Sequence, residues 1–250
     1  MARVIALANL KGGVGRTNVC VNLCMFLSAL GKRVLLVDLS PQGDASFCLG
    51  VKSSSNFLGD VLLRKIKPRT AIKSTSYFGY DIMPSFSKLD EIMSELKGAK
   101  KTEKRLKEAL ERVQDDYDFI IIDTPSDFNV LVANALVAAD EIIIPIQCEY
   151  LALRAANKLA KFIKSFNNLK NKDTSALLTM YGWRSLLSRT IAKRAKKEFP
   201  GYIFNATIPR AIILAQAAEL KEPILKSAPN SRAARAFRQL AEEVISREKK

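Results

Sequence analysis

The chain of 250 residues contains no histidine, and this absence narrows its chemistry. Imidazole is the side chain that titrates nearest to neutral pH and is the commonest metal ligand, so imidazole catalysis and most zinc sites are excluded. No apolar run approaches the roughly 20 residues that a membrane-spanning helix needs. The chain starts at once with a predicted strand, so we expect no signal peptide at this end.

Cysteine is scarce, and its placement does not indicate a metal or redox site. The four cysteines lie in apolar surroundings without the paired spacing of metal ligands; they are Cys20, Cys24, Cys48 and Cys148. We interpret them as small core residues of a protein in a reducing cytosol. A metal or redox site is the alternative interpretation.

Apolar segments that alternate with amphipathic segments predict an α/β fold. The expected strands are 4–8, 33–38, 80–84, 117–123, 141–145, 176–180 and 202–204. The expected helices are 18–27, 56–65, 88–97, 101–113, 130–139, 151–166, 186–199 and 233–247, with an irregular connection at 66–78. Strands that are apolar throughout indicate a mostly parallel, twisted sheet with helices on both faces. No repeat or linker divides the chain, so we expect a single domain over 1–250.

A glycine-rich stretch at residues 9–17, N-L-K-G-G-V-G-R-T, joins the first strand to the first helix. Glycines allow a sharp turn in which successive backbone N–H groups face one anion, and the helix N-terminus adds partial positive charge. Thr17 offers a hydroxyl to a magnesium ion. The stretch therefore predicts a phosphate-binding loop.

Positive charge is concentrated in the second half of the chain. Of the net charge of +15, residues 151–210 contribute +11, because they hold 13 Lys and Arg residues but only Asp173 and Glu198 as acids. A solvated surface is one explanation. A concentration of this kind favours a polyanionic partner, and we expect DNA.

The leading lysine and short glycine spacing of the loop resemble the deviant P-loop of the ParA/MinD family of dimeric ATPases. Four further blocks match the family pattern, so the resemblance covers nearly the whole chain: V-D-L-S-P-Q-G at 37–43, F-I-I-I-D-T-P at 119–125, A-A-D-E-I-I-I-P at 138–145 and I-P-R at 208–210. The resemblance implies a P-loop NTPase fold and a partition ATPase of the ParA/Soj type. It also implies a cytoplasmic, nucleoid-associated protein that forms a homodimer around two ATP molecules and binds DNA nonspecifically. A ParB-like partner would trigger hydrolysis and release.

The resemblance also assigns roles to individual residues. The phosphates of ATP would be held by Gly12, Gly13, Val14, Gly15, Arg16, Thr17 and Asn18. Lys11 would reach the nucleotide of the partner subunit, and Pro209 and Arg210 would pack near the adenine. Mg²⁺ would be held by Thr17, with Asp38 and Asp123 orienting it directly or through water. For Asp123, a capping role at the end of its strand is the alternative.

Two departures from the family pattern bear on catalysis. Arg16 stands where the family has the P-loop lysine, and because a guanidinium is planar, bulkier than a compact ammonium and differently aimed, the change is not conservative. Ser40 stands where the family has a second aspartate that positions the attacking water. Each change is expected to slow hydrolysis by about 10-fold or more. Asp44 is close by, but its position in the loop argues against its replacing that aspartate. Asn18 replaces a second threonine, a milder change.

A third departure concerns DNA. An arginine that supports DNA binding in relatives is Ile213 here. DNA contact is therefore expected to depend on six basic residues, which are Arg184, Arg189, Lys193, Arg194, Lys196 and Lys197.

Two other functions fit parts of the sequence. The first is a pseudo-ATPase, a DNA-binding or scaffold protein whose site no longer turns over, and Arg16 and Ser40 favour it.

The second is a MinD-like ATPase that cycles on membranes through a C-terminal amphipathic helix. The stripe on the last helix is modest and its polar face carries acids as well as bases, so we expect it to pack against the domain and expect no membrane partner. The cysteines are not placed to ligate the cluster of a nitrogenase-type reductase.

Overall fold

A computed structural model describes residues 1–52, 56–86, 89–97, 102–166 and 169–247. Eight strands in these residues form one sheet in the order β3-β4-β2-β5-β1-β6-β7-β8. The strands are β1 Arg3–Leu7, β2 Val34–Asp38, β3 Lys73–Ser74, β4 Tyr80–Met83, β5 Phe119–Asp123, β6 Glu141–Gln147, β7 Asp173–Tyr181 and β8 Tyr202–Pro209. Neighbouring strands are parallel except β3, which pairs antiparallel with β4. The mostly parallel sheet predicted from the sequence is confirmed.

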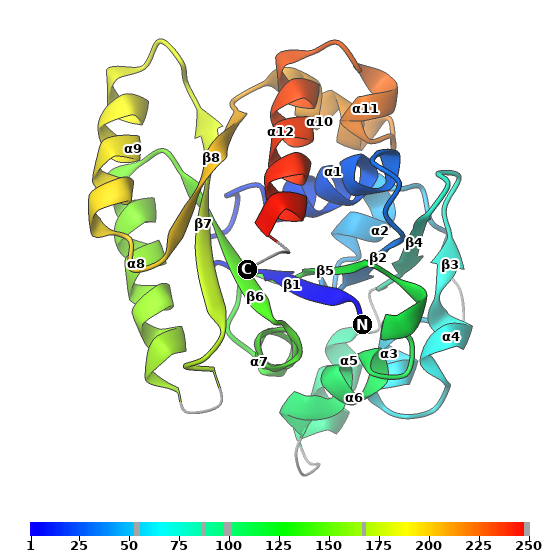
Figure 1. Cartoon of the computed structure of the whole chain (residues 1–250). Helices are drawn as coiled ribbons and strands as arrows, with labels where there is room; N and C mark the ends of the chain where they lie inside the picture. Colours follow the sequence, from blue (N-terminus) through cyan, green and yellow to red (C-terminus); the bar gives the residue numbers. More distant parts are fainter. Residues whose placement is uncertain (53–55, 87–88, 98–101, 167–168, 248–250) are drawn as a thin grey trace.

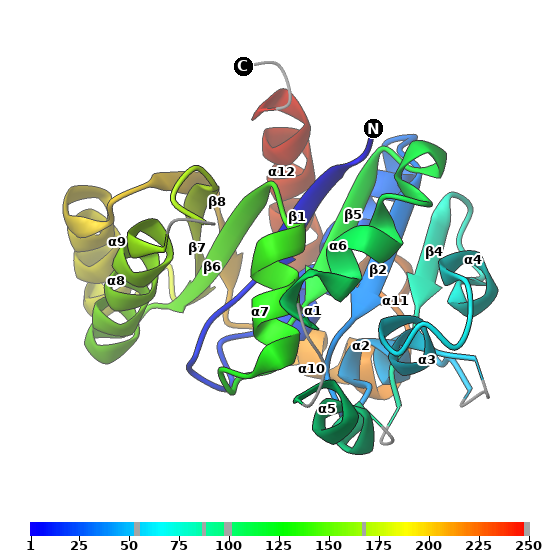
Figure 2. The ribbon, with the colours of Figure 1, turned by 90° about the horizontal axis from the view of Figure 1, so that it is seen from below.

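Helices cover both faces of the sheet, as expected (Figures 1 and 2). The longer helices are α1 Arg16–Ala29, α5 Leu89–Lys97, α7 Val130–Ala138, α8 Tyr150–Ser165, α9 Leu186–Glu198, α10 Ile212–Glu219 and α12 Arg232–Ser246. The shorter ones are α2 Asp44–Cys48, α3 Leu58–Leu62, α4 Pro68–Ala71, α6 Arg105–Leu110 and α11 Ile224–Ser227, with 3₁₀ turns η1 Thr102–Lys104 and η2 Gln114–Asp116.

Strand β5 shows how one apolar run serves two cores. Successive side chains of a strand point to opposite faces. Ile121 therefore packs into the cluster shared with α1 and α12, whereas Ile120 and Ile122 pack into the cluster shared with α6, α7 and α8. All three are fully buried. An unbroken apolar run is thus the signature of a strand covered on both sides.

The carboxyl ends of β1, β2 and β5 lie at the same edge of the sheet. In the ladders, Leu7 of β1 and Asp38 of β2 are both opposite Asp123 of β5. Strand β1 pairs with β5 on one side and with β6 on the other. Strands β2 to β5 lie on one side of β1 and β6 to β8 lie on the other, so the strand order reverses at β1. In open α/β sheets this switch point, outside the carboxyl ends, is where ligands bind.

Several elements differ from the sequence prediction. Strand β8 extends to Pro209 rather than ending at Phe204, because it is an edge strand whose buried and exposed residues alternate and polar residues interrupt its apolar character. The connection 66–78, predicted to be irregular, contains α4 and β3. The predicted helix 101–113 is shorter, since η1 and α6 span Thr102–Leu110. Residues 88 and 101, where two predicted helices begin, lie outside the described residues.

The last helix packs on the domain. Its apolar stripe of Ala233, Phe237, Leu240 and Val244 is at most 1% exposed and contacts the cluster around α1. The expected packing role of this stripe is confirmed. Among the helices described, none has both the length and the apolar character to cross a bilayer.

Candidate functional site

The glycine-rich loop forms an open cradle between β1 and α1. Gly13 and Gly15 have φ angles of 72° and 87°, in the left-handed region that favours glycine. A Cβ atom added at Gly12, Gly13 or Gly15 would meet no atom within 4 Å, so space is free on the side of the loop where a side chain would otherwise stand. Gly15 is the N-cap of α1, which presents the helix N-terminus to this space. An anion fits such a cradle.

Arg16 turns back on its own loop. Its guanidinium donates a hydrogen bond to the backbone carbonyl of Asn9, and the Asn9 side chain in turn donates to the carbonyl of Pro145 at 2.7 Å. Burial lowers the pKa of Arg16, and the charge of Asp123 opposes this shift. The guanidinium is thus partly withdrawn from water and near a carboxylate, rather than extended from the loop as a free cation.

Lys11 is held by residues beyond its own loop. Its Nζ donates to Oε1 of Gln147, the last residue of β6, at 3.1 Å and to Oε2 of Glu149, the N-cap of α8, at 2.9 Å. Its backbone N–H donates to Asn9 Oδ1 at 2.9 Å, which fixes the start of the loop. In this chain Lys11 therefore pairs with an acid of its own subunit.

Asp38 is buried at the end of β2 and is held by the loop that follows. One oxygen accepts the backbone N–H of Ser40 at 2.9 Å, and the other accepts the N–H and hydroxyl of Ser46, each at 2.8 Å. Burial, and then the charge of Asp123, raises the pKa of Asp38 to about 7. These hydrogen bonds favour the charged form but do not offset the burial.

Asp123 is buried at the end of β5, and one of its two carboxylate oxygens lacks a hydrogen-bond donor within the part of the chain that the structure describes. Burial raises its pKa to about 6, although a hydrogen bond with the Thr17 side chain and the charge of Arg16 act against the shift. Its Oδ2 atom has no hydrogen-bond partner among the described residues. A buried carboxylate oxygen without a donor is costly to the fold, and a bound cation would satisfy it.

The oxygens of Thr17, Asp38 and Asp123 suit a hard cation such as Mg²⁺. In the described parts of the chain, no three Cys, Asp or Glu side chains are close enough to hold a metal ion by themselves. Mg²⁺ at phosphate sites is usually bound by one or two carboxylates together with water and phosphate oxygens. A hydroxyl beside two carboxylates, one with an unpaired oxygen, fits that arrangement.

Ser40 and Asp44 are joined across the turn after β2. The Ser40 hydroxyl donates to Asp44 Oδ2 at 3.0 Å. Ser40 is 5% exposed, whereas Asp44, the first residue of α2, is exposed. Gly43 between them has a φ of 67°, and a Cβ added there would lie 2.4 Å from the carbonyl oxygen of Ser85. The turn that presents Asp44 is therefore closely constrained.

A largely apolar cleft of about 340 Å³ adjoins the P-loop. It is lined by Val14, Gly15, Asn18, Val19, Thr179, Met180, Ile208, Pro209, Arg210, Ala211, Leu214, Ala215 and Ala218. Thr179 donates to the carbonyl of Val14 at 2.9 Å, and Asn18 donates to that of Leu214 at 3.2 Å. The cleft thus brings Pro209 and Arg210 beside the loop. No sequence pattern indicated Thr179, because its contact with Val14 spans 165 positions.

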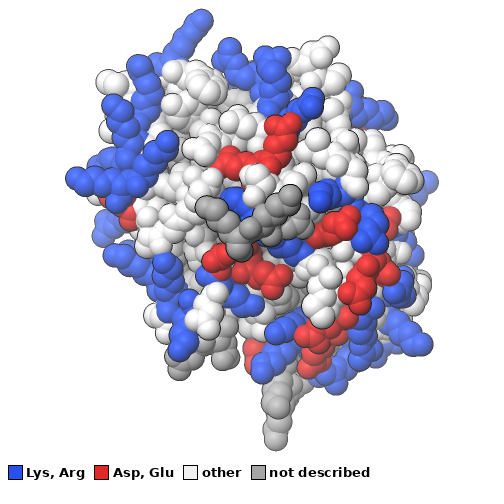
Figure 3. All heavy atoms as spheres, in the orientation of Figure 1, with Lys and Arg blue, Asp and Glu red and all other residues white. Residues whose placement is uncertain are grey.

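The basic side chains of residues 151–210 gather over α8 and α9. Five of the six predicted DNA residues lie on α9, and Arg184 precedes it. Arg154, Lys158 and Lys161 of α8 line a hollow of about 220 Å³ together with Glu198 of α9. We call this surface the α8–α9 basic face; its residues are Arg154, Lys158, Lys161, Arg184, Arg189, Lys193, Arg194, Lys196 and Lys197. Figure 3 shows Lys and Arg gathered over these helices, whereas acidic side chains lie mainly toward the centre and lower right.

Two residues bear on the predicted DNA contacts, one on the α8–α9 basic face and one on α10. Arg194 is bonded to Glu198 at 3.0 Å and lies 4.9 Å from the centre of the Tyr150 ring, so it is not a free cation. Ile213, the residue in place of the family arginine, is half-buried on α10 and packs against the core. The basic residues of α8 belong to the charged region 151–210 but were not among the six residues predicted to contact DNA.

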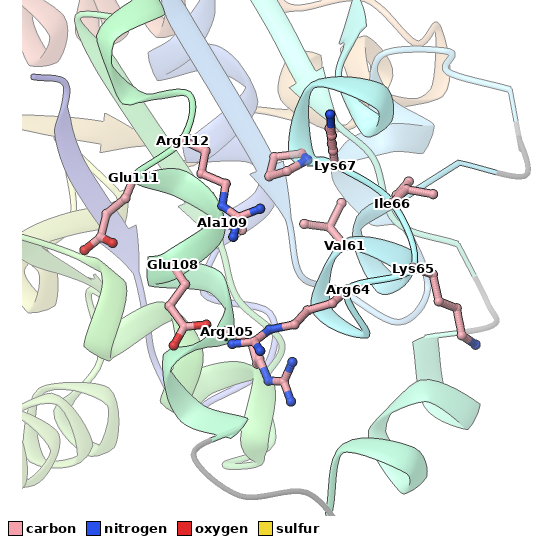
Figure 4. A pocket seen from close by; sticks show the side chains of 11 residues that line it. Val61, Arg64, Lys65, Ile66, Lys67, Arg105, Glu108, Ala109, Glu111 and Arg112 are labelled. Carbon is pink, nitrogen blue, oxygen red and sulfur yellow. Dashed lines mark hydrogen bonds and ion pairs between the residues drawn. The ribbon is translucent and has the colours of Figure 1, made fainter.

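A larger hollow of about 570 Å³ contains none of the predicted site residues. It lies between α6 and the connection from α3 to α4 (Figure 4). In that view Arg112 points into the hollow, whereas Glu111 and Lys65 point away from it. Arg64 is paired with Glu108 across it. The hollow is a charged groove on a different part of the molecule from the P-loop.

A glycine loop that joins the first strand of a parallel sheet to a helix, with carboxylates at the ends of two adjacent strands, defines a P-loop NTPase fold. Comparison with known proteins gives the family. A family model described as "AAA domain" matches residues 2–176. The sporulation initiation inhibitor protein Soj of Bacillus subtilis is 38% identical over 98% of this chain and 99% of its own length. The chain therefore belongs to the ParA/Soj family of P-loop ATPases.

Solved structures agree with this assignment. MinD of Pyrococcus horikoshii, solved with Mg-ADP, has a TM-score of 0.86 at 28% identity, over 100% of this chain and 98% of that one. Cobyrinic acid a,c-diamide synthase of Mycobacterium smegmatis, solved with ADP and magnesium, also has a TM-score of 0.86, at 31% identity over 100% and 96% of the two chains. The fold is that of a ParA/MinD-type P-loop NTPase.

Proposed function

We propose that this protein is a nucleotide-dependent DNA-binding switch that partitions a chromosome, a plasmid or another cargo, and that residues 1–250 act as one ATPase domain. Relatives named as a chromosome partitioning protein ParA and a chromosome-partitioning ATPase Soj support the partition role. The observation that carries the proposal is the meeting of three features at one sheet edge: the open glycine cradle, the buried carboxylates and the apolar cleft.

ATP and Mg²⁺ would occupy this edge. Residues Gly12 to Asn18 would hold the phosphates, and the cleft beside Pro209 and Arg210 would take the adenine. Thr17, Asp38 and Asp123 would hold the metal, which supplies charge neutralisation at the phosphates when bound. Metal binding would also give the unpaired oxygen of Asp123 a partner.

Hydrolysis in this protein would be slow. Arg16 occupies the lysine position and is engaged with the carbonyl of Asn9, so its charge is not freely aimed at the phosphates. Ser40 itself lacks the carboxylate that the aspartate of the family pattern supplies at this position. Phosphoryl transfer depends on positioning and charge stabilisation, so each change weakens the step.

ATP binding would be coupled to formation of a homodimer through Lys11. In the single chain this lysine is held by Gln147 and Glu149. To reach a nucleotide in a partner subunit it must leave them. Because the Lys11–Glu149 pair is partly exposed, its loss would cost little free energy. The ATP-bound dimer would then bind nonspecific DNA with its α8–α9 basic face, in the cytoplasm on the nucleoid, until a ParB-like partner stimulates hydrolysis.

The first test is to measure ATP affinity and oligomeric state in the same samples, with and without Mg²⁺. We expect Mg²⁺-dependent binding that shifts a monomer to a dimer. Fluorescence anisotropy with a random DNA duplex should then show binding that needs ATP and weakens with salt. Absence of ATP-dependent, salt-sensitive DNA binding would contradict the proposal.

A pseudo-ATPase is the second candidate, and the pairing of Arg16 with the Asn9 carbonyl favours it. Such a protein would bind DNA or act as a scaffold without turnover. Phosphate release that requires Mg²⁺ and disappears in Asp123→Ala would exclude this alternative. Liposome co-sedimentation, which we expect to be negative, addresses a membrane-cycling role.

A further inference from the structure

The turn after β2 lacks the carboxylate that the family pattern has at position 40, but it carries a carboxylate at position 44. Ser40 occupies the position of the family's water-positioning aspartate, and four residues later Asp44 accepts a hydrogen bond from its hydroxyl at 3.0 Å. Ser40 is almost fully buried, whereas Asp44 is exposed to solvent. A serine hydroxyl has one proton, and here that proton is directed to Asp44.

We infer that Asp44, joined to Ser40, supplies the carboxylate that orients the attacking water in this protein. The inference rests on the proposed ATPase function and assigns a positioning residue within it. The sequence argued against this role because Asp44 is in the loop. The structure places Asp44 at the start of α2, directly after a glycine turn that Ser85 confines.

The backbone turn just before Asp44 is constrained by its neighbours. Gly43 is forced into the left-handed region, where an added Cβ would collide with the carbonyl of Ser85. The Gly43 N–H also donates to the carbonyl of Ser40 at 2.9 Å, which closes the turn. The turn therefore holds the Asp44 carboxylate beside Ser40 while leaving that side chain exposed to water.

The negative charge of Asp44 also contributes to the pKa shifts of other groups in the site. Burial is the main cause of the raised pKa of Asp123, and the charge of Asp44 adds to it. Burial lowers the pKa of Arg16, and Asp44 is among the acids that oppose this shift. Its charge is thus felt at both the proposed metal ligand and the proposed phosphate ligand.

The proposed step is an ordinary hydrolysis. A water molecule donates one hydrogen bond to the Asp44 carboxylate, and Ser40 can accept a second through its free lone pairs. The water oxygen forms a bond to the γ-phosphorus as the bond between that phosphorus and the bridging oxygen of ADP breaks. The proton released by the water passes by way of Asp44 to solvent. The products are ADP and inorganic phosphate.

The decisive variants are Asp44→Asn and the swap Ser40→Asp/Asp44→Asn. Asparagine keeps an oxygen that can accept from Ser40 but removes the charge. We expect Asp44→Asn to lower kcat at least about 10-fold, with ATP affinity changed less than about twofold. The swap returns a carboxylate to position 40 and should recover most of the lost rate.

A readout independent of turnover is the affinity for ADP with aluminium fluoride and Mg²⁺, which mimics the transferring phosphoryl group. Asp44→Asn should weaken this complex by about 10-fold and leave ATP affinity unchanged, because the carboxylate acts on the transition state. Thermal unfolding of each variant establishes that it is folded. Asp127→Asn is the matched control, since Asp127 is also exposed and also acts on the charge of Arg16.

The outcomes separate this inference from the function on which it rests. If the wild type binds no ATP, the proposed function fails. If it binds ATP but releases no phosphate, the Asp44 inference is overturned and the pseudo-ATPase alternative is favoured. If Asp44→Asn hydrolyses at the wild-type rate, only the Asp44 inference is overturned. An equal loss in Asp127→Asn would also overturn it, because a general effect of negative charge would then explain the result.

Discussion

The nucleotide edge and the α8–α9 basic face hold charge in opposite ways. At the edge, which comprises the loops after β1, β2 and β5, Asp38 and Asp123 are fully buried. Arg16 there is engaged with a backbone carbonyl. On the basic face, Lys193, Lys196 and other cations are exposed to solvent.

This difference predicts how each region responds to substitution. A buried charge acts at short range in a weakly screening environment, so one atom lost at the nucleotide edge has a large effect. Exposed cations are screened, and each contributes a small and similar amount to binding a polyanion. Function at the edge therefore depends on geometry, and function on the basic face depends on the sum of its charges.

The largest effect is expected from Asp123→Ala. This change removes the carboxylate with the unpaired oxygen, so Mg²⁺-dependent ATP affinity should fall by about 100-fold. Titration of a fluorescent ATP analogue, with Mg²⁺ and with EDTA, measures it. With EDTA the variant and the wild type should bind alike, and a variant that still responds to Mg²⁺ would show that the metal is held elsewhere.

The next effect is on DNA binding and requires several changes together. Replacing Arg189, Lys193, Lys196 and Lys197 by alanine should weaken binding about threefold each and about 80-fold together, and should reduce the salt slope by about 3 to 4. The matched control is alanine at Arg64, Lys65, Lys67 and Arg112, around the hollow of Figure 4. Equal losses in the two quadruple variants would mean that net charge alone, and not the basic face, binds DNA.

A smaller effect, in the opposite direction, is expected from Arg16→Lys. An ammonium is more compact than a guanidinium, and the contact with Asn9 would be lost. Phosphate release should then rise by about 10-fold. Arg69→Lys is the control, because Arg69 is paired with Asp116 at 2.6 Å, away from the P-loop. An unchanged or lower rate in Arg16→Lys would mean that the arginine is adapted to this site.

The last prediction concerns stability, and its effect is the smallest when taken per pH unit. The folded protein raises the pKa of Asp38 to about 7 by burial, so between pH 4 and pH 7 the folded state holds a proton that the unfolded state has lost. The free energy of unfolding of the nucleotide-free protein should therefore fall as pH rises through this range, by about 1 kcal/mol per pH unit. Asp123 acts in the same direction.

Denaturant titrations of the wild type and of Asp38→Asn, from pH 5 to pH 8, measure this dependence. The variant lacks the titrating group and should have a flatter profile. A profile that rises with pH would contradict the assigned direction of the pKa shift.

The sequence alone predicted the elements whose causes are local. Residues 119–123 form a strand because an unbroken apolar run can be covered on both faces, and Gly13 and Gly15 turn the loop because only glycine adopts their backbone angles at low cost. The carboxylates at 38 and 123 end their strands, so parallel pairing alone brings them to one edge.

Only the tertiary structure decided the contacts between distant segments. Lys11 meets Glu149 because β1 and β6 are neighbours in the sheet, and Thr179 meets Val14 because β7 follows them. The Ser40–Asp44 bond spans four positions but depends on a turn whose glycine is confined by Ser85. The sequence determined the sheet and its phosphate loop through local apolar pattern and backbone freedom, whereas side-chain partners were set by the strand order, which no local pattern encodes.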